Sequence, residues 1–506
     1  MNEHEYRPNN SRLVIISNRL PIVISKVDDK LQTSSGSGGL VTALAPVLGN
    51  RGGLWIGWPG IGSSDEQEQN QITSILEKEK SKTGFTLYPI FLTEEEVKLY
   101  YNGFSNEIIW PLFHDLQSEC NFEPLYWQSM QKVNQEFALG VQQKYKSGDF
   151  IWVHDYQLLL VGQELRKLGI NEKIAFFLHI PFPSLDIFVK LPWRFQILRA
   201  LLEYDLVGFQ TMRDLRNFIQ CVKRLLPDVK TTYDRPIHLC QTAEREVRIG
   251  AFPISIDYRE FSQMAAGKDV ADQAWLNNEK LDGQNIVFSC DRLDISKGVP
   301  YRLEAIRHLL KNHPELHEKV TFLQVIIPSR TEIPKYHNLK NEIDRIVSEI
   351  NSEYAKTGWV PIQYFFRSIS RKELLAFYLM SEVALITPLK DGMNLVAKEY
   401  VASNVNENGV LVLSEFAGVA TQFQHEALLI NPYDIEGLSE SINTALTMPM
   451  KERKRRMRKM RRNVQKYDVF WWIRTFLDIA IAKELGDFPI VEEYTPTEGV
   501  VEVSHA

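Results

Sequence analysis

The sequence predicts an α/β fold with two doubly wound, Rossmann-like domains that face each other across a cleft. Short apolar runs recur along the chain, polar or glycine residues follow each run, and a helical pattern comes next. Near-continuous apolar strands that alternate with helices are typical of parallel sheets covered on both faces. The length of 506 residues suits two large domains or three ordinary ones.

The apolar runs predict the strands of two sheets. The first set lies at 12–18, 150–155, 174–183 and 205–211, and the second at 285–294, 320–330, 383–392, 409–418 and 427–434. Between the sets, the stretch at 251–261 contains a proline and changes to polar, helix-like sequence, which indicates a domain boundary. We therefore predict an N-terminal domain over 1–255, a C-terminal domain over 256–488 whose last helix returns to the first domain, and an acidic tail over 489–506.

Composition and charge exclude several classes of protein. A formal net charge of −6 argues against a dedicated nucleic-acid binder, whose affinity would need a basic surface. The N-terminus lacks the apolar core of a signal peptide, and no apolar stretch approaches the roughly 20 residues of a membrane span. Four cysteines without a C-x-x-C pair indicate a reducing compartment. We therefore expect a cytoplasmic protein with no nucleic-acid or membrane partner.

Reactive side chains follow the predicted strands. Doubly wound units bind ligands at the carboxyl ends of their strands, although turns also carry Asp and Asn for structural reasons. A cleft between two such domains is therefore the expected site. The strand-end residues are Asn18–Arg19, His154–Asp155, His179, Asp291–Arg292, Ser329–Arg330, Asp391 and Glu415.

The stretch LKDGMNLVAKEY carries two carboxylates, Asp391 and Glu399. Eight helical steps of about 1.5 Å would separate them by roughly 12 Å, whereas paired glycosidase carboxylates lie about 5–9.5 Å apart. A hydrolytic pair is therefore disfavoured. The spacing favours a ligand across a helix start, where the N–H groups of Met393, Asn394 and Leu395 would face its phosphates. Glu399 would then bind a ribose diol; an N-capping Asp with a surface Glu is the alternative.

Cationic and glycine-rich positions suggest how phosphates would be held. Arg292 and Lys297 follow one strand and would offset the charge on a leaving diphosphate, unless they only form salt bridges. Arg19 and Arg330, from different domains, could clamp a phosphate across the cleft. The run SSGSGGL at 34–40 would let the backbone approach a ligand closely, unless it is only a flexible loop. No D-x-D pair offers the usual seat for a nucleotide-bound metal.

Aromatic and histidine side chains admit two interpretations. Aromatics beside Gly and Asn commonly stack on sugars, although Trp in such runs is more often core. His154 and His179 each end a strand, where a structural role is the alternative, and the absence of G-x-S-x-G disfavours a nucleophilic triad. The aromatic residues concerned are Trp55, Trp58, Tyr101 and Trp110.

The basic run at 450–462 would suit RNA or a membrane surface. Met457, Met460 and Val464 recur there at helical spacing. This spacing favours a solvated helix with one packed edge.

Several long motifs together resemble those of the trehalose-6-phosphate synthases, in family order between residues 12 and 435. The motifs are SNRLP, SGGL, WIGWPG, YYNGFSNEIIWPLFH, WVHDYQLL, FFLHIPFPS, DLVGFQT, DRLDISKG, PSR and LKDGMNLVAKEY. The resemblance implies the GT-B fold of two Rossmann-like domains. It also implies retaining transfer of glucose from UDP-glucose, or another nucleotide-glucose, to glucose 6-phosphate, which gives α,α-trehalose 6-phosphate and UDP.

The resemblance implies an acceptor site and a donor site. The acceptor side chains, expected to hold the phosphate and its sugar, are Arg19, Trp58, Tyr101, Trp110, Asp155 and Arg330. The donor positions, expected to hold diphosphate, glucose and ribose, are Gly39, Arg292, Lys297, Asp391, Gly392, Met393, Asn394, Leu395 and Glu399. The residues expected to act at the reacting bond are Asp155, His179, Arg292, Lys297 and Asp391.

The same resemblance implies catalysis with neither a protein nucleophile nor a metal or other cofactor. The leaving phosphate would take the acceptor proton on the same face, so catalysis would rest on positioning and charge stabilisation. The expected partners are the small molecules UDP-glucose and glucose 6-phosphate, and a homo-oligomer is left open.

Two positions depart from the family pattern. HDYHL reads HDYQL, with Gln157 in the second histidine position, and FHY reads FHD, with Asp115 where an aromatic residue is usual. Both lie near the expected acceptor side, so glycerol 3-phosphate, giving glucosylglycerol phosphate, is an alternative acceptor. A catalytically silent sugar-phosphate sensor is a third hypothesis, disfavoured because the cation and carboxylate positions are intact. No aspartyl-phosphatase motif is present.

Overall fold

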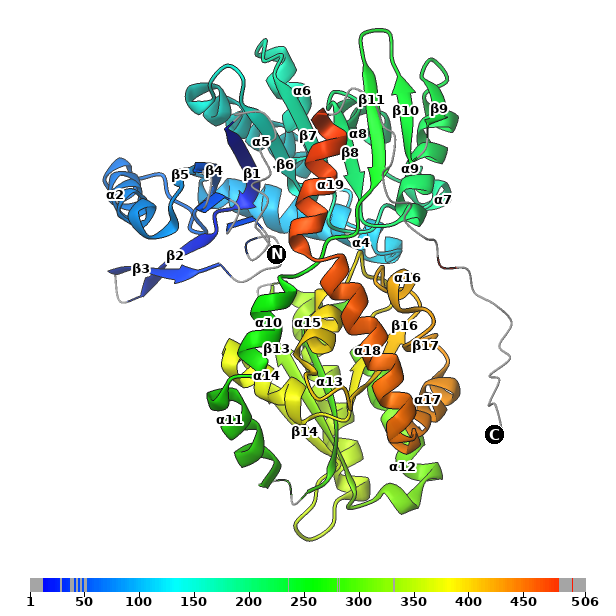
Figure 1. Cartoon of the computed structure of the whole chain (residues 1–506). Coiled ribbons are helices and arrows are strands. Elements are labelled where there is room, and N and C mark those ends of the chain that lie inside the picture. The colour runs from blue at the N-terminus through cyan, green and yellow to red at the C-terminus, as the bar shows by residue number, and fades with distance from the viewer. Residues whose placement is uncertain are drawn as a thin grey trace, which may run out of the picture.

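The computed structural model describes residues 12–481 except 28–29, 37–40, 42–43, 46–47, 50–51, 235, 280, 282 and 331–332, together with Tyr494. Two sheets with their helices form two units, one above the other in Figure 1, which we call the first and second unit. Both units have the predicted Rossmann-like α/β architecture. A separate hairpin of β2 (Ile22–Val27) and β3 (Lys30–Ser35) belongs to neither sheet.

The first unit contains a nine-stranded sheet in the order β5-β4-β1-β6-β7-β8-β11-β10-β9. Neighbours from β5 to β11 run parallel, and β10 pairs antiparallel with both β11 and β9. The strands are β1 (Leu13–Arg19), β4 (Gly53–Trp58), β5 (Thr86–Pro89), β6 (Phe150–His154), β7 (Lys173–Phe177), β8 (Leu206–Phe209), β9 (Lys230–Asp234), β10 (Ile237–Gln241) and β11 (Glu246–Ala251).

The second unit contains a six-stranded, wholly parallel sheet in the order β14-β13-β12-β15-β16-β17. Its inner strands are buried along nearly their whole length, as expected of strands covered on both faces. The strands are β12 (Asn285–Arg292), β13 (Val320–Ile327), β14 (Ile362–Phe366), β15 (Val383–Ile386), β16 (Val410–Ser414) and β17 (Leu428–Ile430).

Some of the strands missed in the sequence lack a continuous apolar run. In β9 every residue is at least partly exposed, because it lies at the open edge of its sheet and meets solvent. In β4, the sequence left open whether Trp55 and Trp58 stack on a sugar or belong to the core, and both are buried within the strand. The nine predicted strands are all present, but most end earlier than predicted, since the polar residues after them form the loops at the sheet ends.

Helices cover both sheets, and their caps are visible in the sequence. For example, Thr211 begins α9 by accepting a hydrogen bond from Asp214 N–H, and Asp434 begins α17 in the same way. The helices of the first unit are α2 (Glu66–Thr83), α3 (Glu94–Glu96), α4 (Trp110–Phe113), α5 (Pro124–Lys144), α6 (Val161–Lys167), α7 (Leu185–Phe188), α8 (Arg194–Leu201) and α9 (Met212–Leu225). The helices that follow the first unit in the sequence are α10 (Tyr258–Ala265), α11 (Lys268–Glu279), α12 (Val299–Asn312), α13 (Pro334–Tyr354), α14 (Arg371–Met380), α15 (Leu395–Ser403), α16 (Ala420–Phe423), α17 (Ile435–Thr447), α18 (Met450–Lys466) and α19 (Val469–Ile481).

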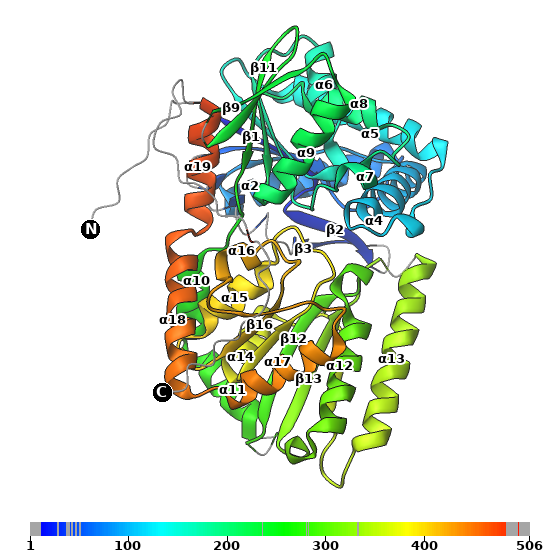
Figure 2. The same cartoon turned by 90° about the vertical axis from the view of Figure 1, so that its right-hand side faces the viewer.

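The last two helices run along both units, as Figure 2 shows. In α19, Phe476 stacks on Trp152 of β6 with ring centroids 4.3 Å apart, and Trp472 donates to the Phe252 carbonyl. The chain leaves the first sheet after Ala251 and enters α10 at Tyr258. We propose that the domain boundary lies between residues 255 and 256 and that the last helix returns to the first unit. Residues 482–488 and all of the tail except Tyr494 lie outside the described residues.

The basic helix α18 has the packed edge that the spacing of its apolar residues predicts. Met457, Met460 and Val464 are buried. Its cations also serve the fold: buried Arg453 donates to the carbonyls of Ala445, Leu446 and Met448 at the end of α17. Donors placed on the last carbonyls of a helix satisfy groups that lack helical partners.

Candidate active site

Loops from both units meet between the two sheets, and several of their residues have unusual backbone conformations. Four of the six non-glycine residues with positive φ in the described part of the chain lie in these loops: Asp115, Asp155, Arg330 and Asn394. Such conformations are disfavoured and cluster at functional sites. Their concentration marks this region as the candidate active site.

The part of the candidate site that the second unit contributes contains an ion pair at its centre. Lys297 Nζ lies 2.5 Å from Asp391 Oδ2, and both side chains are largely buried. Burial alone would raise the pKa of Asp391, but the Lys297 ammonium outweighs it and lowers this pKa below its ordinary value. The ammonium of Lys297 therefore favours the carboxylate form of Asp391.

The segment from Asp391 to Asn394 is not helical, so the distance worked out for a continuous helix does not apply to it. The helix α15 begins at Leu395, and Asn394, in a left-handed conformation, caps it by accepting from Ala397 N–H. Asp391 Oδ1 accepts from Met393 N–H at 3.3 Å and Oδ2 from the Asn394 side chain at 3.1 Å. Because the carboxylate already engages Met393, this amide is less available to a phosphate than the sequence suggested.

Glu399 lies one turn into α15 and is half-buried. Its Oε2 accepts a hydrogen bond from the Tyr378 hydroxyl at 3.0 Å. Burial raises the pKa of Glu399 above its ordinary value, although the Tyr378 hydrogen bond lowers it in part. One carboxylate oxygen is thus fixed by Tyr378, which orients the other.

Arg330 connects the two units. It pairs with Asp294 at 3.0 Å, packs on the Trp110 ring 4.2 Å from its centroid, and lies 3.4 Å from the Tyr156 hydroxyl. Burial alone would raise the pKa of Asp294, but Arg330 keeps it below its ordinary value. Arg292, by contrast, is exposed and has only a longer contact, 5.9 Å, with the Trp110 ring.

Arg19 belongs to the first unit and lacks a carboxylate partner among the described residues. Its guanidinium packs on the Trp58 ring at 4.7 Å and the Tyr101 ring at 5.2 Å, and its buried Nε has no hydrogen-bond partner there. A cavity of about 290 Å³ adjoins Arg19, Tyr101, Asp155 and Gln157. The expected donor residue Gly39 lies outside the described residues.

The helix that carries Tyr101 is itself unusual. Residues Val97–Ile109 form a π-helix, η1, which continues into α4 with Trp110. The π-helix is rare and is found frequently at functional sites. Tyr101 and Trp110 are thereby presented from one continuous helical segment, and Trp110 donates to Asp294 of the second unit at 3.4 Å.

Asp155 and two histidines form the inner wall of the first unit. Asp155 Oδ1 accepts from the backbone N–H groups of Tyr156 and His179, and burial raises its pKa to about 6. His179 Nε2 lies 3.1 Å from His154 Nδ1, and its Nδ1 lies 3.5 Å from the Gln210 amide. Burial lowers the pKa of His179 to about 3, so the ring is neutral at pH 7.

Three neighbours of the predicted residues were missed in the sequence. Tyr156 contacts Arg330, Asp294 anchors it, and buried His114 stacks on Trp110 with ring centroids 4.2 Å apart. Each lies within five positions of a residue that was singled out. All three residues belong to motifs that had already been singled out in the sequence, which could have indicated a role in the site. Only the fold shows that their side chains point toward the site.

The two departures from the family pattern lie in different places. Gln157 borders the cavity beside Arg19, and its buried Oε1 has no partner among the described residues. Asp115 instead reaches the second unit and pairs with Lys390 at 2.6 Å. Only the first of these positions therefore borders the cavity next to Arg19.

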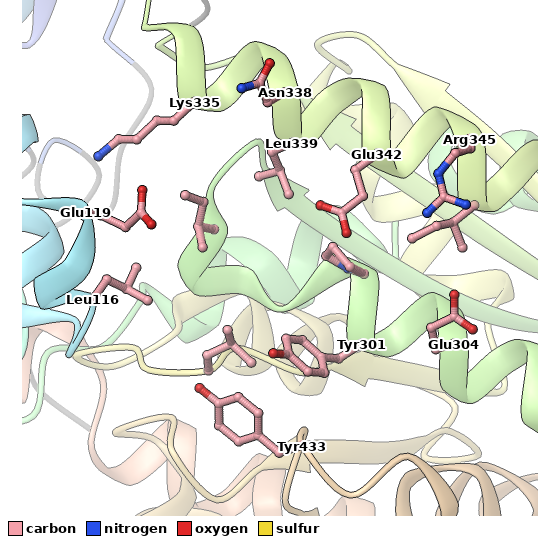
Figure 3. A pocket seen from close by; sticks show the side chains of 14 residues that line it. Leu116, Glu119, Tyr301, Glu304, Lys335, Asn338, Leu339, Glu342, Arg345 and Tyr433 are labelled. Carbon is pink, nitrogen blue, oxygen red and sulfur yellow. The ribbon is translucent and has the colours of Figure 1, made fainter.

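A larger cavity of about 660 Å³ lies on another side of the same interface. Figure 3 shows Leu116 and Glu119 of the first unit opposite Tyr301, Lys335 and other residues of the second. None of the predicted site residues lines it. Across the described residues, no group of three or more His, Cys, Asp or Glu side chains could hold a metal ion. Nor is any described helix long and apolar enough to cross a membrane.

Two Rossmann-like units that enclose such a site between their sheets define a glycosyltransferase of the GT-B class. Residues 11–481 match Glycosyltransferase family 20, and the chain belongs to this family. It is 38% identical over 504 residues to the trehalose-6-phosphate synthase of Mycolicibacterium smegmatis, covering 97% of each chain. The corresponding protein of Mycolicibacterium vanbaalenii is 40% identical over 486 residues, covering 95% of this chain and 98% of that protein.

Solved structures give the same result. An α,α-trehalose-phosphate synthase of Burkholderia xenovorans in complex with glucose-6-phosphate superposes with a TM-score of 0.83 at 32% identity, over 93% of this chain and 100% of that one. An E. coli trehalose-6-phosphate protein bound with UDP-2-fluoro glucose gives 0.83 at 35% identity, over 93% and 99% of the two chains.

Proposed function

We propose that this glycosyltransferase moves glucose from UDP-glucose to glucose 6-phosphate with retention, giving α,α-trehalose 6-phosphate and UDP. The observation that carries the proposal is the Lys297–Asp391 ion pair, which lies where the second unit touches the first. A Cβ atom on the adjacent Gly392 would come within 2.4 Å of the His179 carbonyl oxygen. A sugar held at Asp391 would therefore face the first unit directly.

The second unit would bind the donor. Lys297 and exposed Arg292 would hold the diphosphate, which carries growing negative charge as the glycosidic bond breaks. Asp391 would hold the glucose hydroxyls together with the backbone around Gly392 and Asn394. Glu399, with one oxygen fixed by Tyr378, would accept hydrogen bonds from the ribose diol through the other.

The first unit would bind the acceptor. The Arg19 guanidinium, supported by the Trp58 and Tyr101 rings, would bind the phosphate from one side, and Arg330 would approach it from the other beside Trp110. Asp155, which lines the cavity beside Arg19, would accept a hydrogen bond from the acceptor sugar. Two cations on one phosphate fix both its position and its orientation.

The chemistry would proceed without a protein nucleophile. His154 and His179 are neutral, because burial lowers the pKa of both, so neither can deliver a proton as a cationic acid at neutral pH. Both ring nitrogens of His179 also have partners in the first unit. The departing phosphate oxygen would therefore take the acceptor hydroxyl proton on the face where the new bond forms, while Lys297 and Arg292 stabilise its charge.

The test is UDP release with a panel of acceptors. With UDP-glucose, we expect the highest kcat/KM for glucose 6-phosphate and only donor hydrolysis for glucose itself. Preference for glycerol 3-phosphate would assign the alternative reaction, and no release above the donor-only control would leave the sensor hypothesis. Turnover undiminished by EDTA would support the metal-independent mechanism that we propose. Cytoplasmic location and a homo-oligomer stay predictions.

A further inference from the structure

The loop that carries Asp391 is also tied to the first unit by a contact outside the substrate groups. Lys390 follows β15, and its ammonium reaches across the interface to Asp115 Oδ2 at 2.6 Å. The two residues are 275 positions apart. Asp115 is 48% exposed at its side chain and Lys390 only 11%, so the pair spans the rim and the interior of the interface.

Three contacts leave the Lys390 loop little freedom within its own unit. Leu389 N–H donates to the Ser296 carbonyl at 2.7 Å, and Asp391 N–H donates to the Phe416 carbonyl at 3.3 Å. Asp391 also pairs with Lys297. The loop is thus rigid with respect to the second unit, and a force on Lys390 is transmitted to the whole donor side.

On the first unit, Asp115 is anchored through its backbone. It follows the end of α4 in a left-handed conformation, φ 61°, and its N–H donates to the Leu112 carbonyl. Asp tolerates this conformation better than most side chains. The same short helix begins with Trp110, which contacts Arg330 and Asp294. One rigid element therefore makes both contacts with the second unit.

The other charged groups near Lys390 do not replace Asp115. Asp214 and Arg213 of α9 lie close enough to raise and lower its pKa respectively, although burial lowers it more. The Asp214 carboxylate already accepts from the Phe182 N–H at 3.0 Å and the Thr211 hydroxyl at 2.5 Å. Asp115 is thus the carboxylate left to balance Lys390 at this face.

We propose that Asp115 and Lys390 are positioning residues that hold the two units in the closed arrangement. The proposal rests on the proposed function, because closure matters where one ligand contacts both units. The pair sets the distance between Asp391, on the donor side, and the wall of Asp155 and His179. The cavity of Figure 3 opens directly beside it, lined by Leu116 and Leu389, the neighbours of the two residues.

The pair therefore favours binding of a ligand that bridges both units but leaves binding within one unit unchanged. Glucose 6-phosphate would bridge them through Arg19 and Arg330, whereas every described residue expected to bind UDP belongs to the second unit; Gly39 of the first unit lies outside the described residues. Coupling between two sites of a protein typically changes ligand affinity at least about fivefold. Because Asp115 is partly exposed, we expect the effect of this ion pair to lie at the lower end of that range.

The experiment is a double-mutant cycle of Asp115→Asn and Lys390→Met. Asn keeps the size of Asp and tolerates the left-handed conformation, so this variant removes only the charge. We expect each single variant to raise KM for glucose 6-phosphate about five- to tenfold, and the double variant to match the worse single one. The Kd of UDP measured without acceptor should change less than twofold. Hydrogen exchange of the peptide at 386–394 should be faster in the ligand-free Asp115→Asn protein.

The matched control is Asp228→Asn, which breaks an ion pair of 2.7 Å with Arg199 inside the first unit and should change neither KM nor exchange. Unchanged KM and exchange in Asp115→Asn, or additive effects in the cycle, would overturn the proposal. If Lys390→Met does not fold, Asp115→Asn alone decides the question. A wild-type protein without transferase activity would refute the proposed function, while hydrogen exchange would still test the positioning role.

Discussion

The two sides of the candidate site differ in how their charges are satisfied. On the second unit, the expected donor residues Lys297 and Asp391 form an ion pair. On the first, Arg19 packs on aromatic rings, and its Nε and the Oε1 of Gln157 are buried without partners among the described residues. Buried polar groups are rarely left unsatisfied in native proteins. We therefore infer that the proposed donor side is assembled before substrate arrives, whereas the proposed acceptor side is completed by its ligand.

This difference predicts that donor-side changes disturb both catalysis and the site itself. Lys297→Ala removes the cation expected to stabilise the leaving diphosphate and leaves the largely buried Asp391 without its partner. We expect kcat to fall on the order of 10²- to 10³-fold, measured as UDP release. Far-ultraviolet circular dichroism should be unchanged, because the sheet around β12 does not depend on this side chain.

A matched control is Lys340→Ala, which removes the ion pair with Asp344 on the surface of α13 and should retain full activity. An unchanged rate in Lys297→Ala would show that Lys297 has no catalytic role. It would also contradict the inference that the donor site is formed before substrate binds.

On the acceptor side, a change should affect binding and leave the rest of the site intact. In Arg19→Ala, we expect KM for glucose 6-phosphate to rise roughly 10- to 100-fold, since a charge-assisted contact with the phosphate is lost. Arg19→Lys should recover part of the affinity, because an ammonium keeps the charge but not the planar stacking on Trp58 and Tyr101.

Affinity for UDP is the control in both Arg19 variants and should stay at the wild-type value. A comparable loss of UDP affinity would mean that Arg19 serves the donor, and the contrast between the two sides would fail.

The sequence predicted the fold and nine of the strands, because buried parallel strands are continuous apolar runs, although most of these strands end earlier than predicted. It did not predict the edge strand β9 or its neighbour β10, whose partly exposed residues give no such run. The sequence also did not predict which charged side chains form ion pairs. Lys297 and Asp391, 94 positions apart, were both identified as ligand-binding residues, yet no local pattern indicates that they bind each other.

Backbone conformation was the second gap. Asn394 was expected inside a helix start, whereas its left-handed conformation ends the preceding loop and begins α15. The short loop between β15 and α15 must turn sharply to bring Asp391 beside Lys297, and this requirement comes from the tertiary structure. The same reasoning applies to Asp115, a departure from the family pattern in the sequence and an interface contact in the structure.

The smallest effect that we predict for the donor and acceptor sides is a pH dependence at Asp155. Burial raises the pKa of this carboxyl from 3.8 to about 6, so about nine-tenths is ionised at pH 7 and about one-tenth at pH 5. If the carboxylate accepts a hydrogen bond from the acceptor, kcat/KM for glucose 6-phosphate falls about tenfold over this range. The second ionisation of a phosphate monoester lies near pH 6 as well. The measured quantity is therefore the ratio of wild type to Asp155→Asn at each pH, and a constant ratio would contradict the prediction.

Neighbouring histidines should not obscure this change, since burial lowers the pKa of His179 to about 3 and of His114 to about 4. The sign for stability is opposite to that for activity. Because its folded-state pKa is raised, Asp155 holds its proton more tightly in the folded chain, and its contribution to stability is lost as pH rises from 3.8 to about 6. Thermal unfolding of wild type and Asp155→Asn should therefore converge below pH 4, while wild-type activity rises toward pH 7. On the acceptor side, the ligand thus requires the ionised form of Asp155, which burial disfavours in the empty site. On the donor side, by contrast, Lys297 and Asp391 stabilise each other's charges.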